Sequence, residues 1–325
     1  MQLVLDSTGI TVKKRNECFY VSTEKQSRLI SPHKITSIAV LADCMISAAV
    51  IRLAAKHEIA ILFFNRTGKV ESRLWSPKFG SIATIRRNQV FFGVSKEATA
   101  WVVELFQLKT RHQVQNIDYL INRRKSLAVE LSKSKMQIIG WSDDFNNCRG
   151  KYLKTEKNKL LGIEGNIARR YWESIALVLP EPWTFTTRNR RPATDFFNAL
   201  LNYRHGMMYS QVESAIFTSG LDPYLGIFHV DEYNKPSLTF DLIEPFRSWV
   251  DRFIIESCLQ EKIEPSFFEN KNNNGIWISK AGKKFLIPSF NTWIEKVRLF
   301  DHKKLSTKNH IHRFAGLFAQ KLKDL

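Results

Sequence analysis

The periodicity of the apolar residues changes once along the chain, near residues 75–80, and this change constrains the fold most. Before it, short segments alternate apolar and polar residues and are rich in β-branched side chains, which is typical of strands. The predicted strands are residues 3–5, 10–13, 18–21, 35–41, 59–64 and 70–75. A helix is expected among them at residues 47–57, where alanine and other helix-favouring residues dominate.

After the segment WSPKFG at residues 75–80, the pattern becomes that of long helices. They are predicted at residues 82–109, 114–134, 159–179, 194–218, 242–259 and 289–299, and a short hairpin is predicted to pair residues 275–278 with 284–287. The expected fold class is therefore α+β. A small β-rich N-terminal domain at residues 1–78 precedes a larger, mainly α-helical domain at residues 79–325.

Basic residues exceed acidic ones by a wide margin, with 49 Lys and Arg against 31 Asp and Glu and a formal net charge of +18. They gather in two stretches. Residues 149–191 carry ten Lys and Arg against four Glu, and residues 296–325 carry eight against two Asp. The net charge alone is equally compatible with a soluble basic protein, but such clusters are typical of contact with a phosphate backbone. Nucleic acid is the favoured partner.

The cysteines and the apolar segments indicate the cellular setting. The four cysteines lie far apart and form no C-x-x-C pair, so a reduced cytoplasmic setting is expected rather than a disulfide framework or a zinc cluster. The first residues lack the apolar block of a secretory signal. No apolar stretch approaches the roughly 20 residues of a membrane span. We therefore expect a soluble cytoplasmic protein without membrane contact.

An acidic residue lies within the apolar face of the helix predicted around residues 160–175. At about 100° per residue, Glu164 falls at the centre of a stripe that includes Leu160, Ile167 and Tyr171. A buried carboxylate without a partner is costly and must be compensated. Two interpretations stay open: a structural acid that is protonated or paired with an arginine, and a functional acid.

A histidine and two further acids follow a turn-rich apolar segment. His229 ends this segment, and Asp241 and Glu244 come later, three residues apart. This spacing puts the two acids on one helical face, opposite the apolar residues, and Pro245 is tolerated only in a first turn. We expect both acids at a helix start, facing a cleft or solvent. Taken singly, His229 is an ordinary histidine, Asp241 an N-cap and Glu244 a solvated acid.

Together, Glu164, His229 and Glu244, with Asp241 as an accessory residue, form a donor set for a metal. Carboxylates dominate and no thiolate takes part, so Mg²⁺ or Mn²⁺ suits the set better than zinc. A divalent cation beside basic clusters is typical of phosphodiester chemistry, because the metal stabilises charge on phosphoryl oxygens. The combination predicts a metal-dependent DNA-processing enzyme.

Six ordered segments, reaching to about residue 252, resemble the CRISPR-associated protein one family, the metal-dependent endonuclease and integrase of spacer acquisition. The longest are LGIEGNIARRYW at 161–172, RPATDFFNALLNY at 191–203, GLDPYLGIFH at 220–229 and PSLTFDLIEPFR at 236–247. The shorter ones are SAA at 47–49 with HEIAILFF at 57–64, and RRNQ at 86–89.

This resemblance implies a β-rich, dimerising N-terminal domain and a helical catalytic domain that binds metal and DNA. It further implies a homodimer that joins a small companion CRISPR adaptation protein to hold a double-stranded DNA fragment. By motif, Glu164, His229 and Glu244 are the implied metal ligands and Asp241 is accessory. The family often has Asp at the third ligand position, so Glu244 departs from it.

Phosphate contacts are expected from arginines, each of which has a surface ion pair as its alternative role. The predicted DNA-binding residues are Arg169, Arg188, Arg190, Arg191 and Arg247. Arg247 lies one turn from Glu244, and the further alternative is that it orients that ligand. Neighbouring aromatic residues either stack on frayed bases or belong to the core. They are Tyr171, Trp172, Trp183 and Phe185.

The hypothesised reaction is a transesterification, in which the 3′-hydroxyl of a DNA fragment attacks a phosphodiester at the boundary of a CRISPR repeat. Two other functions stay open. One is a metal-dependent nuclease of branched DNA that never joins strands. The other is a non-catalytic DNA binder, for which Glu164→Ala leaves every DNA transaction unchanged.

Overall fold

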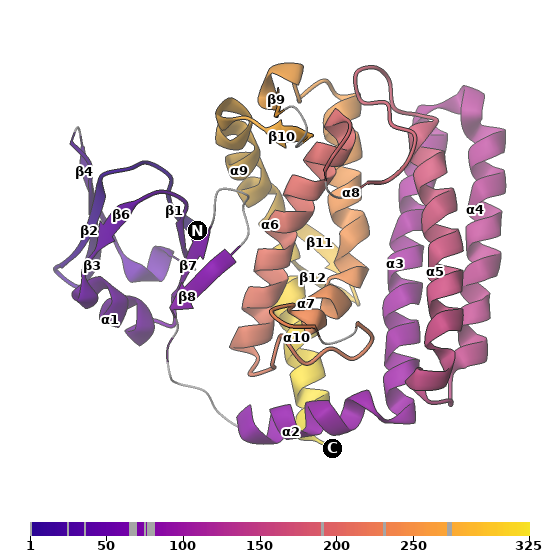
Figure 1. Ribbon diagram of the computed structural model, residues 1–325, viewed down its shortest axis with the longest axis horizontal. Coiled ribbons are helices and arrows are strands. Elements are labelled where there is room, and N and C mark those ends of the chain that lie inside the picture. Colours follow the sequence, from indigo (N-terminus) through magenta and orange to yellow (C-terminus); the bar gives the residue numbers. More distant parts are fainter. Residues whose placement is uncertain are drawn as a thin grey trace. The chain divides into compact units, whose positions relative to one another are not determined.

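The computed structural model describes residues 2–24, 26–35, 37–64, 70–74, 76, 82–189, 192–229, 232–271 and 275–325. Contacts divide the chain into two compact units, Met1–Gly80 and Ser81–Leu325. The first unit is rich in strands and the second is mainly helical (Figure 1), so the predicted fold class is confirmed.

Two four-stranded sheets and one α-helix are found among the described residues of the first unit. One sheet has the order β1-β5-β7-β8, with β1 Gln2–Leu5, β5 Ser37–Val40, β7 Ala60–Phe64 and β8 Val70–Leu74. The other has the order β4-β3-β2-β6, with β4 Ser27–Ile30, β3 Cys18–Ser22, β2 Ile10–Arg15 and β6 Cys44–Ile46. Apolar residues of both sheets pack with the helix α1 (Ala48–Lys56) into one core. Strands β4 and β6 were not predicted, because β4 is largely exposed and β6 has only three residues.

The second unit contains nine helices and four short strands within the part of the chain that the structure describes. The helices are α2 Ile82–Gly93, α3 Lys96–Arg123, α4 Ala128–Asp143, α5 Leu153–Ala176, α6 Phe196–Thr218, α7 Ser237–Leu242, α8 Glu244–Leu259, α9 Lys280–Ile294 and α10 Thr307–Lys323. The strands form two antiparallel pairs, β9 Phe268–Asn270 with β10 Ile276–Ile278 and β11 Val297–Phe300 with β12 Lys303–Ser306.

The predicted helix at residues 82–109 is in fact two helices, and the boundary comes from a capping serine. Ser95 adopts an extended backbone, and its side chain accepts a hydrogen bond from the amide of Ala98. This cap begins α3 as a new helix. Helix α3 then continues beyond the predicted end, because Ile117 and Leu120 extend its buried face.

The predicted hairpin between residues 275–278 and 284–287 is wrong in its second strand. Strand β10 pairs with β9 instead, and residues 284–287 lie inside α9. Ser279 accepts a hydrogen bond from the amide of Gly282 and starts this helix. Leu286 and Phe290, one helical turn apart, are both buried. The end of the predicted helix at 289–299 is strand β11.

Helices α3, α4 and α5 lie side by side, and α8 packs against α3 and α6 (Figure 1). Their apolar faces form a single large core that is separate from the core of the first unit. Helix α3 contacts both α5 and α8, so side chains from three distant parts of the sequence meet there. Among the described residues, no helix has the length and the apolar composition to cross a lipid bilayer.

Candidate active site

Glu164 lies on the buried face of α5, as its helical position predicted. Leu160, Ile167 and Tyr171, on the same face, are buried, and the Glu164 side chain is only 25% exposed. The face turns toward α3, where the partner of this carboxylate is found.

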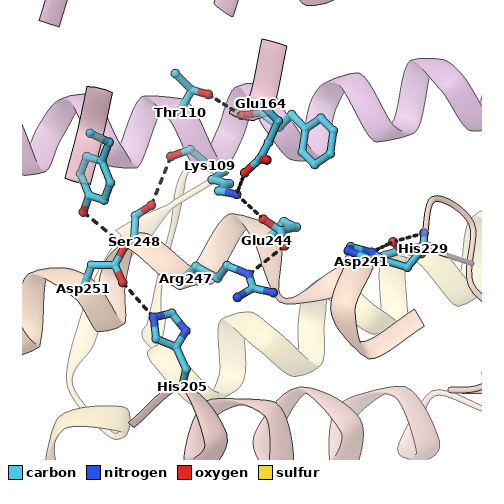
Figure 2. Close-up of polar contacts among 12 residues, drawn as sticks. Lys109, Thr110, Glu164, His205, His229, Asp241, Glu244, Arg247, Ser248 and Asp251 are labelled. Carbon is cyan, nitrogen blue, oxygen red and sulfur yellow. Dashed lines mark hydrogen bonds and ion pairs between the residues drawn. The ribbon is translucent and has the colours of Figure 1, made fainter. Parts of the chain in front are cut away.

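Lys109 of α3 provides the compensating charge. Its Nζ lies 2.5 Å from Glu164 Oε1 and 2.7 Å from Glu244 Oε2, so one ammonium bridges two carboxylates (Figure 2). Burial alone would lower the pKa of Lys109, but Glu244 and Glu164 raise it above its usual value. The sequence pattern predicted an arginine partner or protonation, and Lys109 was not among the predicted site residues. The available signal was that Lys109 follows the buried Leu105 and Phe106 by four and three residues, a cation on an apolar face.

Asp241 and Glu244 are buried, with exposed fractions of 1% and 5%, and so the expectation that they face a cleft or solvent is wrong. They also belong to two helices, since α7 ends at Leu242 and α8 begins at Glu244. Pro245 lies in the first turn of α8, as predicted. Contacts of this segment with α3 and α6 cover the face that the local pattern left polar.

Glu244 is held between two cations. Its Oε1 accepts a hydrogen bond from Nε of Arg247 at 2.8 Å, and its Oε2 faces Lys109. Burial raises the pKa of Glu244, but Arg247, Lys109 and, to a smaller extent, His229 lower it to about 2. The carboxylate is therefore charged at neutral pH and His229 is near enough to influence it.

His229 is positioned by Asp241. Its Nδ1 lies 2.6 Å from Asp241 Oδ1 (Figure 2), while the two oxygens of Asp241 also accept hydrogen bonds from the amides of Ile227, Phe228 and His229. Asp241 thus holds the loop before α7 rather than capping a helix. A carboxylate partner places the proton of a neutral imidazole on Nδ1 and leaves the lone pair on Nε2 for a ligand.

The structure brings Glu164 and Glu244 to one point, but Lys109 stands between them. Within the described residues, no group of three His, Cys, Asp or Glu side chains has the arrangement of a metal centre. The donor chemistry nevertheless fits a divalent cation. Two charged oxygens already share one positive group, and the buried Glu244 Oε2 accepts no well-directed hydrogen bond in the described part of the chain.

The predicted DNA-binding arginines have different surroundings. Arg169 is exposed, and Arg188 donates hydrogen bonds to Asn198 and Asn202 at 3.0 and 2.7 Å. Arg247 is partly buried and pairs with Glu244, the geometry of its alternative role as an orienting residue. Arg190 and Arg191 lie outside the described residues.

The aromatic residues near the first basic stretch belong to the core. Tyr171, Trp183 and Phe185 are buried, and Trp172 packs against the same cluster. The Tyr171 hydroxyl donates to Asp251 at 3.2 Å, and Asp251 also lies 2.9 Å from Nε2 of His205. Asp251 lies one turn beyond Arg247 on α8, and its contact with His205 joins this helix to α6 (Figure 2).

Comparison with solved structures places the fold in one group. A casposase bound to integration product superposes with a TM-score of 0.80 at 20% identity, covering 99% of this chain and 90% of the casposase. A Cas6-RT-Cas1–Cas2 complex gives a TM-score of 0.77 at 19% identity, covering all of this chain and 35% of that one. The two-unit architecture is therefore the fold shared by casposases and Cas1 proteins.

Sequence comparison then identifies the family. The model of the CRISPR associated protein Cas1 family matches residues 3–292. A protein of Archaeoglobus fulgidus named CRISPR-associated endonuclease Cas1 1 is 29% identical over 301 residues, covering 89% of this chain and 87% of that protein. This chain belongs to the Cas1 family, which confirms the resemblance found in the sequence.

Proposed function

We propose that this protein is a divalent-metal-dependent DNA endonuclease and integrase that inserts short double-stranded DNA fragments into a CRISPR array. Three comparisons support the proposal: the family match, a relative named as an endonuclease, and a casposase of the same fold bound to an integration product. The observation that carries it is the convergence of Glu164 and Glu244 on one cation position, with His229 nearby.

In the proposed site Glu164, Glu244 and His229 would hold Mg²⁺ or Mn²⁺. When bound, the metal would neutralise charge that develops on a phosphoryl oxygen. Asp241 orients His229, and Arg247 fixes the carboxylate of Glu244. A fragment's 3′-oxygen bonds to phosphorus and loses its proton to solvent. The bond from that phosphorus to the repeat strand's 3′-oxygen breaks, and that oxygen takes a proton from solvent to become a 3′-hydroxyl. The number of phosphodiester bonds is unchanged.

The proposed assembly contains two copies of the chain, a small companion adaptation protein and both DNA partners. Support for the companion comes from the Cas6-RT-Cas1–Cas2 complex, one of whose chains shares this fold. The net charge of +18 supports a polyanionic partner.

A strand-joining assay tests the proposal. Duplex fragments with 3′-hydroxyl ends are incubated with a supercoiled repeat plasmid, the protein and Mg²⁺ or Mn²⁺, and branched products are resolved under denaturing conditions. Glu164→Gln and Glu244→Gln should each reduce joining on the order of 100-fold or more, because each substitution removes a charged ligand of the proposed metal. Glu173→Gln, an exposed acid of the same helix paired with Arg170, is the matched control and should join normally.

Other outcomes would support the other functions. Plasmid nicking without joined strands would indicate a nuclease alone. Equal joining by wild type and Glu164→Gln would exclude the proposed site. Fragments ending in a dideoxynucleotide should not join, since they lack the attacking oxygen.

A further inference from the structure

A cleft of about 730 Å³ is lined by residues of α3 and α8. Trp249, Arg252 and Glu256 of α8 line it, and their spacing of three and four places them on one helical face. Glu244 and Arg247 share a different face of the same helix. The hairpin of β11 and β12 and helices α9 and α10 contribute the remaining walls.

More basic than acidic side chains line the cleft. Three arginines line it, Arg111, Arg252 and Arg298, together with the acids Glu256 and Asp301. Arg252 binds Glu256 at 2.6 Å, and Asp301 is bound from outside the lining by Arg313 at 2.7 Å. Arg111 and Arg298 thus remain without an acidic partner within 4.0 Å among the described residues.

Arg298 is held in place. Its Nε donates to the Thr307 hydroxyl at 2.9 Å, and its guanidinium carbon lies 5.5 Å from the ring centre of Trp249 and 5.1 Å from that of Trp293. Such an ordered guanidinium is suited to a phosphate, since its fixed donors match phosphate oxygens. Arg111 is exposed at the other wall, on α3.

The same cleft also has apolar and hydrogen-bonding groups that suit a nucleotide base. Phe300 and Phe314 are partly exposed, and Leu299 is 69% exposed. Nδ1 of His112 donates to the carbonyl of Pro245 at 2.7 Å, which leaves its Nε2 as an acceptor, and Gln115 adds an amide. Aromatic walls, basic side chains and a few polar groups form the usual combination for unpaired nucleotides.

We propose that this cleft binds an unpaired nucleotide of the DNA substrate, with its phosphate on Arg111 and Arg298 and its base against Phe300. The inference rests on the proposed DNA substrate and adds a second contact site to it. A volume of about 730 Å³ admits a nucleotide but not a duplex. Nearly half of the lining comes from residues 293–317, beyond the residues 3–292 that the family model matches.

One of the contacts between α3 and α8 links the cleft to the position next to Glu244. Pro245, whose carbonyl accepts the hydrogen bond of His112, directly follows Glu244 at the start of α8. A nucleotide held against His112 is therefore one residue removed from a proposed metal ligand. Through this contact, a bound DNA tail would affect the position of the Glu244 carboxylate.

DNA binding by the full-length protein tests the proposal. Fluorescence anisotropy compares a blunt duplex with the same duplex carrying an unpaired tail, at several salt concentrations. In wild type the tail should raise affinity by roughly tenfold. Arg111→Ala and Arg298→Lys should each remove most of this gain and leave the blunt duplex unaffected. For Arg111→Ala, the slope of log affinity against log salt should fall by about one for the tailed DNA alone.

Arg124→Ala is the matched control, an exposed arginine that caps α3 and lies outside the cleft lining. It should retain the gain from the tail. Equal losses for tailed and blunt DNA in Arg111→Ala would overturn the cleft proposal and leave the proposed function standing. Absence of DNA binding by wild type would instead overturn the proposed function.

A crosslink locates the tail independently of the variants. A tail containing 5-iododeoxyuridine is irradiated on the wild-type protein, and the modified peptide is identified by mass spectrometry. Attachment within residues 297–302 or at Trp249 supports the proposal. Attachment confined to residues outside the cleft lining contradicts it.

Discussion

At the scale of single residues, the buried group of Lys109, Glu164 and Glu244 dominates the electrostatics of the helical unit. Each carboxylate alone would be strongly destabilising at this depth, and the ammonium between them compensates both. The same arrangement marks a position where a divalent cation would be favourable. The metal that we propose would therefore compete with Lys109 for the same two oxygens.

Substitution of Lys109 tests this competition between the ammonium group and the proposed metal. Lys109→Met leaves the buried Glu244 and the partly buried Glu164 facing each other and should lower the free energy of unfolding by about 3–5 kcal/mol without metal. Millimolar Mn²⁺ should restore part of that loss and shift the melting temperature of the variant more than that of wild type. Thermal and urea unfolding with and without the metal provide the measurement.

Lys135→Met is the control for this substitution. Lys135 pairs with Asp118 at 2.6 Å in a partly exposed bridge, which is worth less than about 1 kcal/mol. If Lys109→Met were no more destabilising than this control, the ion pairs of Lys109 would contribute no more to stability than an exposed ion pair.

His112 makes stability depend on pH. Burial is the main reason that its pKa falls to about 4, well below the value of about 6.5 expected in the unfolded chain. Between these values the unfolded state binds more protons, so wild type should lose up to about 1.4 kcal/mol per pH unit as the pH falls from 6.5 toward 4. In His112→Gln this part of the slope should disappear. Parallel urea-unfolding profiles of the two proteins would contradict the assignment.

At the scale of helices and strands, the element boundaries depend on specific local groups. Ser95 divides α2 from α3, and Ser279 starts α9 in place of a predicted strand. The first turn of α9 also lies against the 3-10 turn that precedes β9, which leaves no room for a side chain at Gly282. A Cβ there would lie 2.3 Å from the carbonyl oxygen of Phe267.

Two glycines of helices should respond in opposite directions to alanine. Gly282→Ala should destabilise the protein by about 1–3 kcal/mol, because a backbone atom blocks the new methyl group. Gly140→Ala in α4 should stabilise it by about 0.5–1 kcal/mol, because the added Cβ meets no described atom within 4 Å and alanine favours helix. Chemical denaturation of both variants measures the difference, and effects of the same sign would argue against this packing of α9.

At the scale of the whole molecule, the two units have separate hydrophobic cores. The core of the first unit draws only on residues up to Leu74, and that of the second begins at Ile85. All the described residues of the candidate active site and of the proposed cleft lie in the second unit. Its fold therefore contains the groups needed for both.

A chain of residues 82–325 should accordingly fold by itself. We expect a helical circular dichroism spectrum, one cooperative thermal transition and a Mn²⁺ affinity within about threefold of the intact protein, since no described ligand is removed. Isothermal titration with Mn²⁺ checks the last point. Loss of cooperative unfolding would show that the first unit is required for the helical core.

The sequence by itself determined the division into a strand-rich and a helical part, and the burial of Glu164. Both follow from local periodicity, because the spacing of apolar residues specifies the type of element and which face it buries. The family resemblance rested equally on local segments. These properties can be predicted without knowledge of any contact between elements.

The tertiary structure alone decided which side chains meet. Lys109 reaches Glu164 from 55 residues away, and the contacts of α3 and α6 bury Asp241 and Glu244, which local pattern left polar. The cleft beside Arg298 requires α3, α8, α10 and a hairpin to assemble together. Charge pairing and enclosure are properties of packed elements, since they depend on distances that residue spacing along one helix does not set.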